Sequence, residues 1–121
     1  MTKTILIVDD SSSVRSVVGI ALKGAGYDVI EAVNGQDALD KLQGQKVHLI
    51  VSDVNMPVMD GITFVKEVKK LSQYKFTPIC MLTTEAGQSM MAEGKAAGAK
   101  AWIVKPFQPP KLLDVVAKLL P

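Results

Sequence analysis

The chain has 121 residues, of which 48% are hydrophobic and 21% are charged, and its formal net charge is +2. This length is typical of one domain with one core, and the composition excludes disordered and fibrous proteins. Because the net charge is small and the lysines are scattered, the sequence does not show the basic stripe of a nucleic-acid-binding protein.

Short β-branched runs alternate with helical patterns along the chain. Five runs predict strands, at residues 4–8, 28–32, 48–52, 78–83 and 101–104. The strict alternation predicts right-handed crossovers, a parallel sheet and helices on both faces, which is a doubly wound α/β fold with five helices. No linker, repeat or low-complexity segment interrupts the pattern, so we expect a single domain over residues 1–121.

The first two helices have clear start and stop signals. In the first, Ser11 to Ser13 offer a cap and Gly26 offers a stop. The second spans about residues 34–43, and Gly44 ends it. The residues expected to face the core are Val14, Val17, Val18, Ala21, Leu22 and Ala25 in the first helix, and Ala38, Leu39 and Leu42 in the second.

The other three helices differ in the strength of their patterns. The third begins at Asp60-Gly61, the fifth follows Pro109-Pro110, and both carry apolar stripes. The fourth, at about residues 87–97, contains two glycines and no clean stripe, so we expect it to be the most mobile helix. The residues expected inward are Ile62, Phe64, Val65, Val68 and Leu71 in the third helix, and Leu112, Leu113, Val116, Leu119 and Leu120 in the fifth.

Polar side chains lie at the ends of four predicted strands. Asp9 and Asp10 follow the first strand and Asp53 follows the third, while Thr83 and Lys105 lie at the ends of the fourth and fifth. Because ligands of such sheets bind at the carboxyl ends of the strands, we expect these residues to share one rim. Carboxylates at this spacing raise one another's pKa, and a bound cation usually offsets that cost. The sequence therefore predicts the functional site at this rim.

Each motif also has a purely structural interpretation. An Asp-Asp pair before serines often caps a helix, and a threonine or lysine at a strand end is usually an ordinary edge residue. Their coincidence with Asp53 at one rim favours a site. Asp60-Gly61 is more typical of a turn and cap, and His48 of a surface or hydrogen-bonded histidine. Either core filling or a pliable partner surface would explain Met56, Met59, Met90 and Met91.

Cys80 and the N-terminal segment bear on the compartment. A single cysteine excludes an internal disulfide framework, and its position in the apolar run 79–82 predicts a buried thiol in a reducing compartment. The first apolar stretch is too short to span a membrane, and no small-residue cleavage site accompanies it. We therefore expect a cytoplasmic protein that does not engage a membrane.

Four groups of residues stand in the order and spacing of a known family: Asp9-Asp10, Asp53 with Met56-Pro57 and Asp60-Gly61, Leu82-Thr83-Thr84, and Lys105-Pro106-Phe107. In these groups the chain resembles the receiver domains of two-component response regulators, especially the stand-alone chemotaxis regulators. The resemblance spans essentially the whole chain. It implies the flavodoxin-like receiver fold with strand order 2-1-3-4-5, and a receiver without an output domain.

The resemblance implies phosphoryl transfer at the rim. Asp53 resembles the phosphoacceptor, whose carboxylate attacks a phosphohistidine and forms an aspartyl phosphate. Magnesium prefers carboxylate and carbonyl oxygens. We therefore expect Asp10 and Asp53 as direct ligands of Mg²⁺, with Asp9 acting through water. The backbone carbonyl of Asn55 would complete the protein ligands.

Lys105 and Thr83 complete the expected phosphoryl site. Lys105 would supply positive charge to the phosphoryl oxygens, and Thr83 would supply a hydroxyl donor. Base rates favour a trans Lys105-Pro106 peptide bond. Members of the family usually have a cis bond here that aims the lysine inward, so the resemblance implies the cis form.

The resemblance also implies a switch. In the family, the threonine that matches Thr83 moves toward the phosphoryl group, and an aromatic residue of the fifth strand turns inward. Trp102 stands at that place, and its bulky indole with an N–H predicts a constrained swing. The alternative is a tryptophan that merely packs on the strand. Asn55 and Glu85 are expected to flank the path of water and tune the lifetime of the phosphoryl group. Thr84 is expected to slow phosphorylation by small phosphodonors because of its size.

We expect a phosphorylation-activated regulator, not a free-standing enzyme, that switches its affinity for a partner in chemotaxis. The expected partners are a histidine kinase docking near the first helix, an effector such as a flagellar motor switch protein, and a phosphatase, with the chain itself monomeric. A phosphorelay intermediate or phosphate sink would have the same rim. A flavodoxin-type cofactor carrier is disfavoured by the acidic turn Asp9-Asp10. A small-molecule phosphohydrolase is disfavoured because Asn55 stands where a second carboxylate would be needed.

Overall fold

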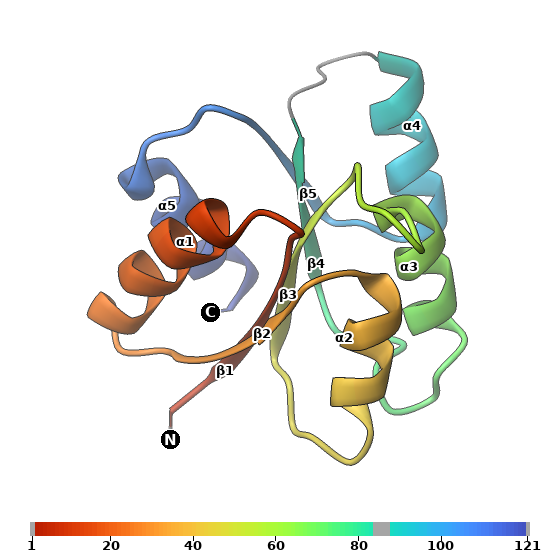
Figure 1. Ribbon diagram of the computed structural model, residues 1–121, viewed down its shortest axis with the longest axis horizontal. Helices are drawn as coiled ribbons and strands as arrows, with labels where there is room; N and C mark the ends of the chain where they lie inside the picture. The colour runs from red at the N-terminus through yellow and green to blue at the C-terminus, as the bar shows by residue number, and fades with distance from the viewer. Residues whose placement is uncertain (1, 84–87, 121) are drawn as a thin grey trace.

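The computed structural model describes residues 2–83 and 88–120. Within these ranges strands and helices alternate strictly around a central sheet (Figure 1). The strands are β1 (Thr4–Val8), β2 (Asp28–Ala32), β3 (Leu49–Asp53), β4 (Ile79–Thr83) and β5 (Ala101–Val104). The helices are α1 (Ser12–Gly24), α2 (Gly35–Leu42), α3 (Gly61–Lys69), α4 (Gln88–Ala97) and α5 (Pro109–Leu119).

The sheet is parallel throughout and has the order β2-β1-β3-β4-β5. Figure 1 shows α1 and α5 on one face, and α2, α3 and α4 on the other. The doubly wound α/β fold is thereby confirmed, as is the strand order that the resemblance implied. From β1 the chain first adds β2 on one side and then crosses to add β3 on the other side. The crevice at the carboxyl ends of β1 and β3, where the strand order switches, is the expected ligand site.

The predicted element bounds differ from the observed ones by one residue in several places. β4 begins at Ile79 because Pro78 has no N–H to donate, although the Pro78 carbonyl accepts a hydrogen bond from the Ile50 N–H. β3 extends one residue further than predicted and therefore includes Asp53. In α2, Asn34 lies outside the helix and caps it, since its side chain accepts a hydrogen bond from the Asp37 N–H.

The buried faces of the helices are narrower than predicted. Val17 of α1 is 51% exposed and Ala25 lies beyond the end of α1, also exposed, so both predictions of a core position are wrong. Leu71 is 40% exposed because α3 ends at Lys69 and the helical spacing stops there. Among the predicted core residues of α5, Leu112 and Val116 are buried, and Leu113, Leu119 and Leu120 are half-buried.

Two hydrophobic cores hold the layers together, one on each face of the sheet. In β1, Leu6 and Val8 point to the core shared with α2 and α3, while Ile5 and Ile7 point to the core shared with α1 and α5. Cys80 lies in the second core, as predicted, and burial raises the pKa of its thiol to about 12. Along the described chain, we find no helix with the length and apolar character needed to cross a bilayer.

Gly61 allows α3 to begin directly against the end of β3. A Cβ atom at Gly61 would lie 2.1 Å from the backbone oxygen of Asp53 and 2.8 Å from Cα of Val54. The Gly61 N–H donates a hydrogen bond of 2.7 Å to the Val54 carbonyl, which closes the loop between β3 and α3. Asp60 caps the helix by accepting a hydrogen bond from the Thr63 N–H. Asp60-Gly61 therefore has the turn and cap role predicted for it.

We expect Gly61→Ala to lower the free energy of unfolding by about 3 kcal/mol, because the added methyl group meets backbone atoms that cannot rotate away. Gly24→Ala is the matched control, since a Cβ atom there meets nothing within 4 Å. Its effect should stay below about 1 kcal/mol. Urea denaturation of both variants checks this. Equal changes in the free energy of unfolding of the two variants would show that the backbone at Gly61 shifts to accommodate a methyl group.

Candidate functional site

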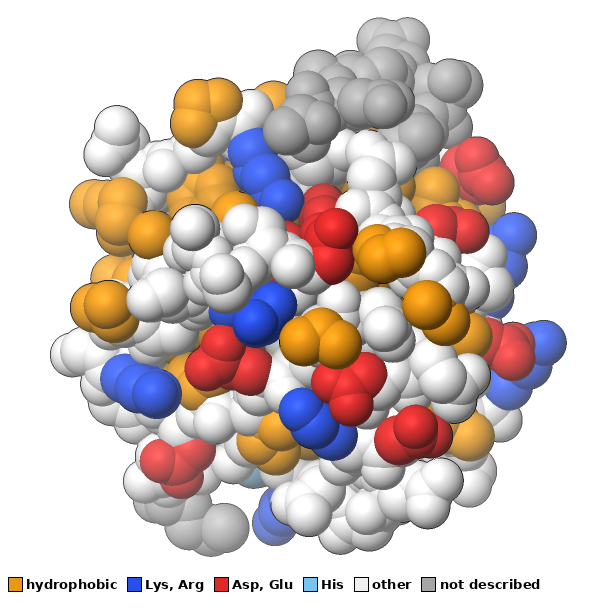
Figure 2. Space-filling view, in the orientation of Figure 1, with side chains coloured by type: hydrophobic (Ala, Val, Ile, Leu, Met, Phe, Trp, Pro, Cys, Tyr) orange, Lys and Arg blue, Asp and Glu red, His pale blue; other side chains and the backbone are white. Residues whose placement is uncertain are grey.

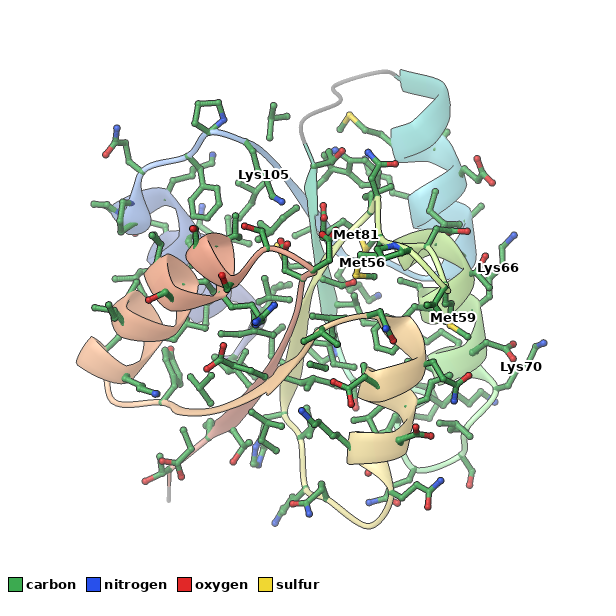
Figure 3. The ribbon with its side chains drawn as sticks, in the orientation of Figure 1. Met56, Met59, Lys66, Lys70, Met81 and Lys105 are labelled. Carbon is green, nitrogen blue, oxygen red and sulfur yellow. The ribbon has the colours of Figure 1, made fainter. Side chains whose placement is uncertain are left out.

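The carboxyl ends of β1, β3, β4 and β5 bring together the polar residues predicted to share a rim. Asp9 follows β1, Asp53 is the last residue of β3, Thr83 is the last of β4, and Lys105 follows β5. Figure 3 shows the Lys105 side chain reaching from the segment after β5 toward the ends of β1 and β3. The fold thus places residues almost one hundred positions apart in sequence at one edge.

Three carboxylates form the acidic side of the rim. Oxygen atoms of Asp9, Asp10 and Asp53 all lie within 4.8 Å of one another. Asp9 and Asp53 are only 1% and 6% exposed, whereas Asp10 is exposed. Such a set of hard oxygen donors with one side open to solvent suits a divalent cation such as Mg²⁺.

Lys105 supplies the positive charge nearest to these carboxylates. Its Nζ atom lies 3.0 Å from Oδ2 of Asp9 and 3.3 Å from Oδ1 of Asp53. The peptide bond between Lys105 and Pro106 is cis, as the family resemblance implied. The Lys105 N–H donates to the Thr83 carbonyl at 2.6 Å, which holds the start of this segment against the end of β4.

Backbone contacts hold two of the carboxylates in place. Oδ1 of Asp9 accepts a hydrogen bond of 2.8 Å from the Ser11 N–H, and Oδ1 of Asp53 accepts one of 2.9 Å from the Val54 N–H. Ser11, not Asp10, caps α1, because its hydroxyl accepts from the Val14 N–H. The Asp-Asp pair therefore does not serve as the side-chain cap of this helix.

Arg15 is a positioning residue that the sequence did not reveal. Its Nη1 atom donates to the Asp9 backbone carbonyl at 2.6 Å, and its Nε atom donates to Glu31 of β2 at 3.2 Å. The guanidinium thus ties α1 and β2 to the turn that carries Asp9. The sequence offers only a weak signal for this, an arginine one turn into a helix that follows an acidic turn.

Burial and like charge oppose the ionisation of Asp53. Burial, followed by the charge of Asp9, raises the pKa of Asp53, and the nearby Lys105 ammonium lowers it by less. Burial lowers the pKa of Lys105, but the hydrogen bond and charge of Asp9, followed by those of Asp53, outweigh it and raise this pKa above its ordinary value. The rim thus favours a charged lysine and penalises a charged Asp53.

The loop after Asp53 contains a strained turn. Val58 has a φ of 71°, in the left-handed region that β-branched residues rarely adopt, and its side chain is exposed. The Met59 N–H donates to the Pro57 carbonyl at 2.7 Å, so Val58 is the centre of a γ-turn. This turn reverses the chain between Asn55 and Asp60, next to the carboxylate cluster.

The other predicted residues differ in exposure and in distance from the carboxylates. Asn55 is exposed, two positions after Asp53, and Trp102 is half-buried in β5. Thr83 is buried. His48 lies at the opposite edge, where its Nδ1 atom accepts a hydrogen bond from the Thr4 N–H, so it is the hydrogen-bonded histidine predicted from the sequence. The predicted tuning residues Thr84 and Glu85 lie outside the described residues.

Comparisons with known proteins match most of this chain. The response regulator receiver domain family matches residues 5–117. Chemotaxis protein CheY1 of Helicobacter pylori is 39% identical over 118 residues, which cover 96% of this chain and 95% of that protein. The structure of chemotaxis protein CheY4 of Vibrio cholerae superposes with a TM-score of 0.95 at 50% identity, covering 98% of this chain and 99% of that one.

A more distant structural relative contains a metal ion. The receiver domain of sensor histidine kinase PA1611 from Pseudomonas aeruginosa has a TM-score of 0.91 at 26% identity, covering 99% of this chain and 98% of that chain. Its structure has a magnesium ion coordinated in the active site cleft.

We expect Asp53→Asn to be more thermally stable than the wild type at pH 7 in EDTA. The raised folded-state pKa means that ionised Asp53 costs stability above that pKa, and that this cost vanishes below the ordinary value of 3.8. The advantage of the variant should therefore shrink as the pH falls toward 3.8. Thermal unfolding from pH 3.5 to 7.5 checks this.

Added Mg²⁺ should reverse the order, because an ion that binds only the native cluster stabilises the wild type more than a variant without the carboxylate. An Asp53→Asn variant that is less stable in EDTA at pH 7 would contradict the electrostatic penalty described above.

Proposed function

Because the chain belongs to the response regulator receiver domain family, we propose that it accepts a phosphoryl group from a histidine kinase on Asp53 and then changes its affinity for a partner protein. The observation that carries this is the contact of Lys105 with both Asp9 and Asp53, at 3.0 and 3.3 Å, beside a three-carboxylate cluster. A nucleophilic carboxylate next to fixed positive charge is what phosphoryl transfer to aspartate requires.

The roles of the rim residues follow from their chemistry. An Asp53 carboxylate oxygen attacks phosphorus, the P–N bond to the kinase histidine breaks, and a P–O bond forms. Lys105 neutralises the charge of the phosphoryl oxygens, and it is poised for this because it already contacts Asp53. Thr83 ends the adjacent strand and would donate its hydroxyl to a phosphoryl oxygen.

The donor set fits Mg²⁺. We assign Asp10 and Asp53 as direct ligands, Asp9 as a ligand through water, and the backbone carbonyl of Asn55 as a further ligand. When bound, the ion would supply positive charge next to the transferred phosphoryl group. The magnesium in the cleft of the Pseudomonas aeruginosa receiver supports this assignment.

An apolar groove next to Lys105 supports docking of the kinase near α1. Its volume is about 400 Å³, and it opens between α1 and the segment after β5. Hydrophobic side chains gather on this side of the molecule (left in Figure 2). Lys105 lines the groove and also contacts the carboxylates of the rim. A kinase segment bound in the groove would therefore hold its phosphohistidine close to the rim. The groove is lined by Ser13, Val14, Val17, Lys105, Pro106 and Phe107.

The relatives named for chemotaxis support a role in that process, with an effector such as a flagellar motor switch protein and a phosphatase as further partners. The effector would read the face formed by α4, β5 and α5, and Trp102 would report the state of the rim there. Asn55, Thr84 and Glu85 would tune the rate and lifetime of phosphorylation. We further propose that this receiver domain acts as a cytoplasmic monomer.

A phosphorelay intermediate or phosphate sink is the second candidate, because it would use the same rim and differ only in its partner. The receiver family consists of signalling proteins, which argues against the flavodoxin-type carrier and the metabolic phosphohydrolase. Any turnover would be confined to phosphorylation and dephosphorylation of Asp53 itself.

We expect the chain to gain the mass of one phosphoryl group when incubated with acetyl phosphate and Mg²⁺, and to gain none in EDTA. Asp53→Asn should not be modified, since it lacks the nucleophile. Asp60→Asn is the matched control, because it changes a nearby carboxylate whose capping role asparagine can fill. Intact-protein mass spectrometry reads the result. Modification of Asp53→Asn, or none of the wild type, would overturn the proposed function.

A further inference from the structure

The indole of Trp102 lies directly on Gly94 of α4. A Cβ atom at Gly94 would lie 2.4 Å from Cζ3 of the indole and 3.3 and 3.4 Å from Cε3 and Cη2. Any residue other than glycine would therefore displace the ring. Gly94 is buried within the helix, where glycine is less favourable than alanine. The ring contact supplies a physical reason for a glycine at this position.

The indole N–H is unpaired in this position. Its Nε1 atom is buried and, within the described chain, is the one buried side-chain nitrogen or oxygen without a hydrogen-bond partner. Burial of the ring favours this position of Trp102, while the unpaired donor opposes it. A ring lifted from Gly94 would gain water for its N–H and lose the burial. The inward position of the ring therefore depends on how closely the indole can pack against α4.

Gly94 also connects the ring to the end of α4. Its carbonyl accepts a hydrogen bond of 3.0 Å from the Ala99 N–H, and the Lys95 carbonyl accepts one of 3.0 Å from the Gly98 N–H. With a φ of +122° at Gly98, these bonds form a Schellman motif that ends the helix. β5 begins two residues after Ala99. Gly94 therefore contacts the ring through its Cα side and takes part in the end of α4 through its carbonyl.

We propose that Gly94 is a positioning residue: because it has no side chain, the indole of Trp102 packs inward against α4, and a side chain at this position would hold the ring away from the helix. This inference rests on the proposed function, because α4 and β5 form part of the face that the effector would read. The connection to the rim is short. Thr83 pairs with Val104, which lies two residues from Trp102 on the same side of β5.

The first test replaces Gly94 by alanine and reads the fluorescence of Trp102, the single tryptophan of the chain. A methyl group at Gly94 should lift the indole into water, shift its emission to longer wavelength and increase its quenching by acrylamide. Gly19→Ala in α1 is the matched control, because a Cβ atom there makes only an ordinary contact of 3.9 Å with Ile7. Emission and quenching of Gly94→Ala equal to those of the wild type would overturn the proposal.

The second test is a double-mutant cycle between the two positions. Gly94→Ala should lower Tm by about 4 °C or more while Trp102 is present, because the methyl group collides with the ring. In a Trp102→Leu background the same change should raise Tm, since alanine favours the helix and the ring is gone. The same change in Tm in both backgrounds would show that the contact does not constrain α4.

A third test distinguishes the role of Gly94 from phosphorylation of Asp53. Beryllofluoride with Mg²⁺ mimics the aspartyl phosphate and should lower acrylamide quenching in the wild type, because the matching aromatic residue of the family turns inward on activation. The decrease should be much smaller in Gly94→Ala, whose methyl group keeps the ring from packing on α4. An equal response in both proteins would reject Gly94 as the positioning residue and leave phosphorylation intact. Phosphoryl incorporation from acetyl phosphate, measured in parallel on the wild type, tests the proposed function alone.

Discussion

The sharing of Lys105 between Asp9 and Asp53 is the interaction on which the rest of the structure depends. It joins the ends of three strands, because Asp9 follows β1, Asp53 ends β3 and Lys105 follows β5. One ammonium group among three clustered carboxylates leaves an excess of negative charge, so the rim is held together and still attracts a cation. The strand order and the contact of Arg15 with the Asp9 carbonyl help to keep this arrangement in place.

Three local features of the fold are energetically unfavourable by themselves. Asp53 is held where burial and Asp9 oppose its charge, Val58 occupies a left-handed backbone conformation, and the indole of Trp102 buries an unpaired N–H. Asp53 lies at the rim, Val58 lies in the loop after it, and Trp102 lies in β5, two residues before the partner of Thr83. Strain concentrated in this way is typical of a site whose state must change on ligand binding or modification.

Local patterns predicted the elements to within a residue or two, and the carboxyl-end rule predicted the rim from Asp9, Asp53, Thr83 and Lys105. The strand order did not follow from periodicity and came from the family resemblance. Contacts between distant segments were beyond the sequence: nothing local shows that Gly94 receives Trp102 or that Arg15 binds the Asp9 carbonyl. Val17 was misassigned because helical spacing reports an apolar residue but not whether another element covers it.

The most direct test asks whether the Lys105 ammonium offsets negative charge that would otherwise attract a metal ion. Isothermal titration calorimetry at pH 7 would compare the affinity for Mg²⁺ of the wild type with that of Lys105→Met. Methionine keeps much of the side-chain length and removes the charge that now contacts Asp9 and Asp53. With the competing ammonium gone, we expect the variant to bind Mg²⁺ several-fold more tightly. Equal or weaker binding by the variant would contradict the view that lysine and metal share one acidic site.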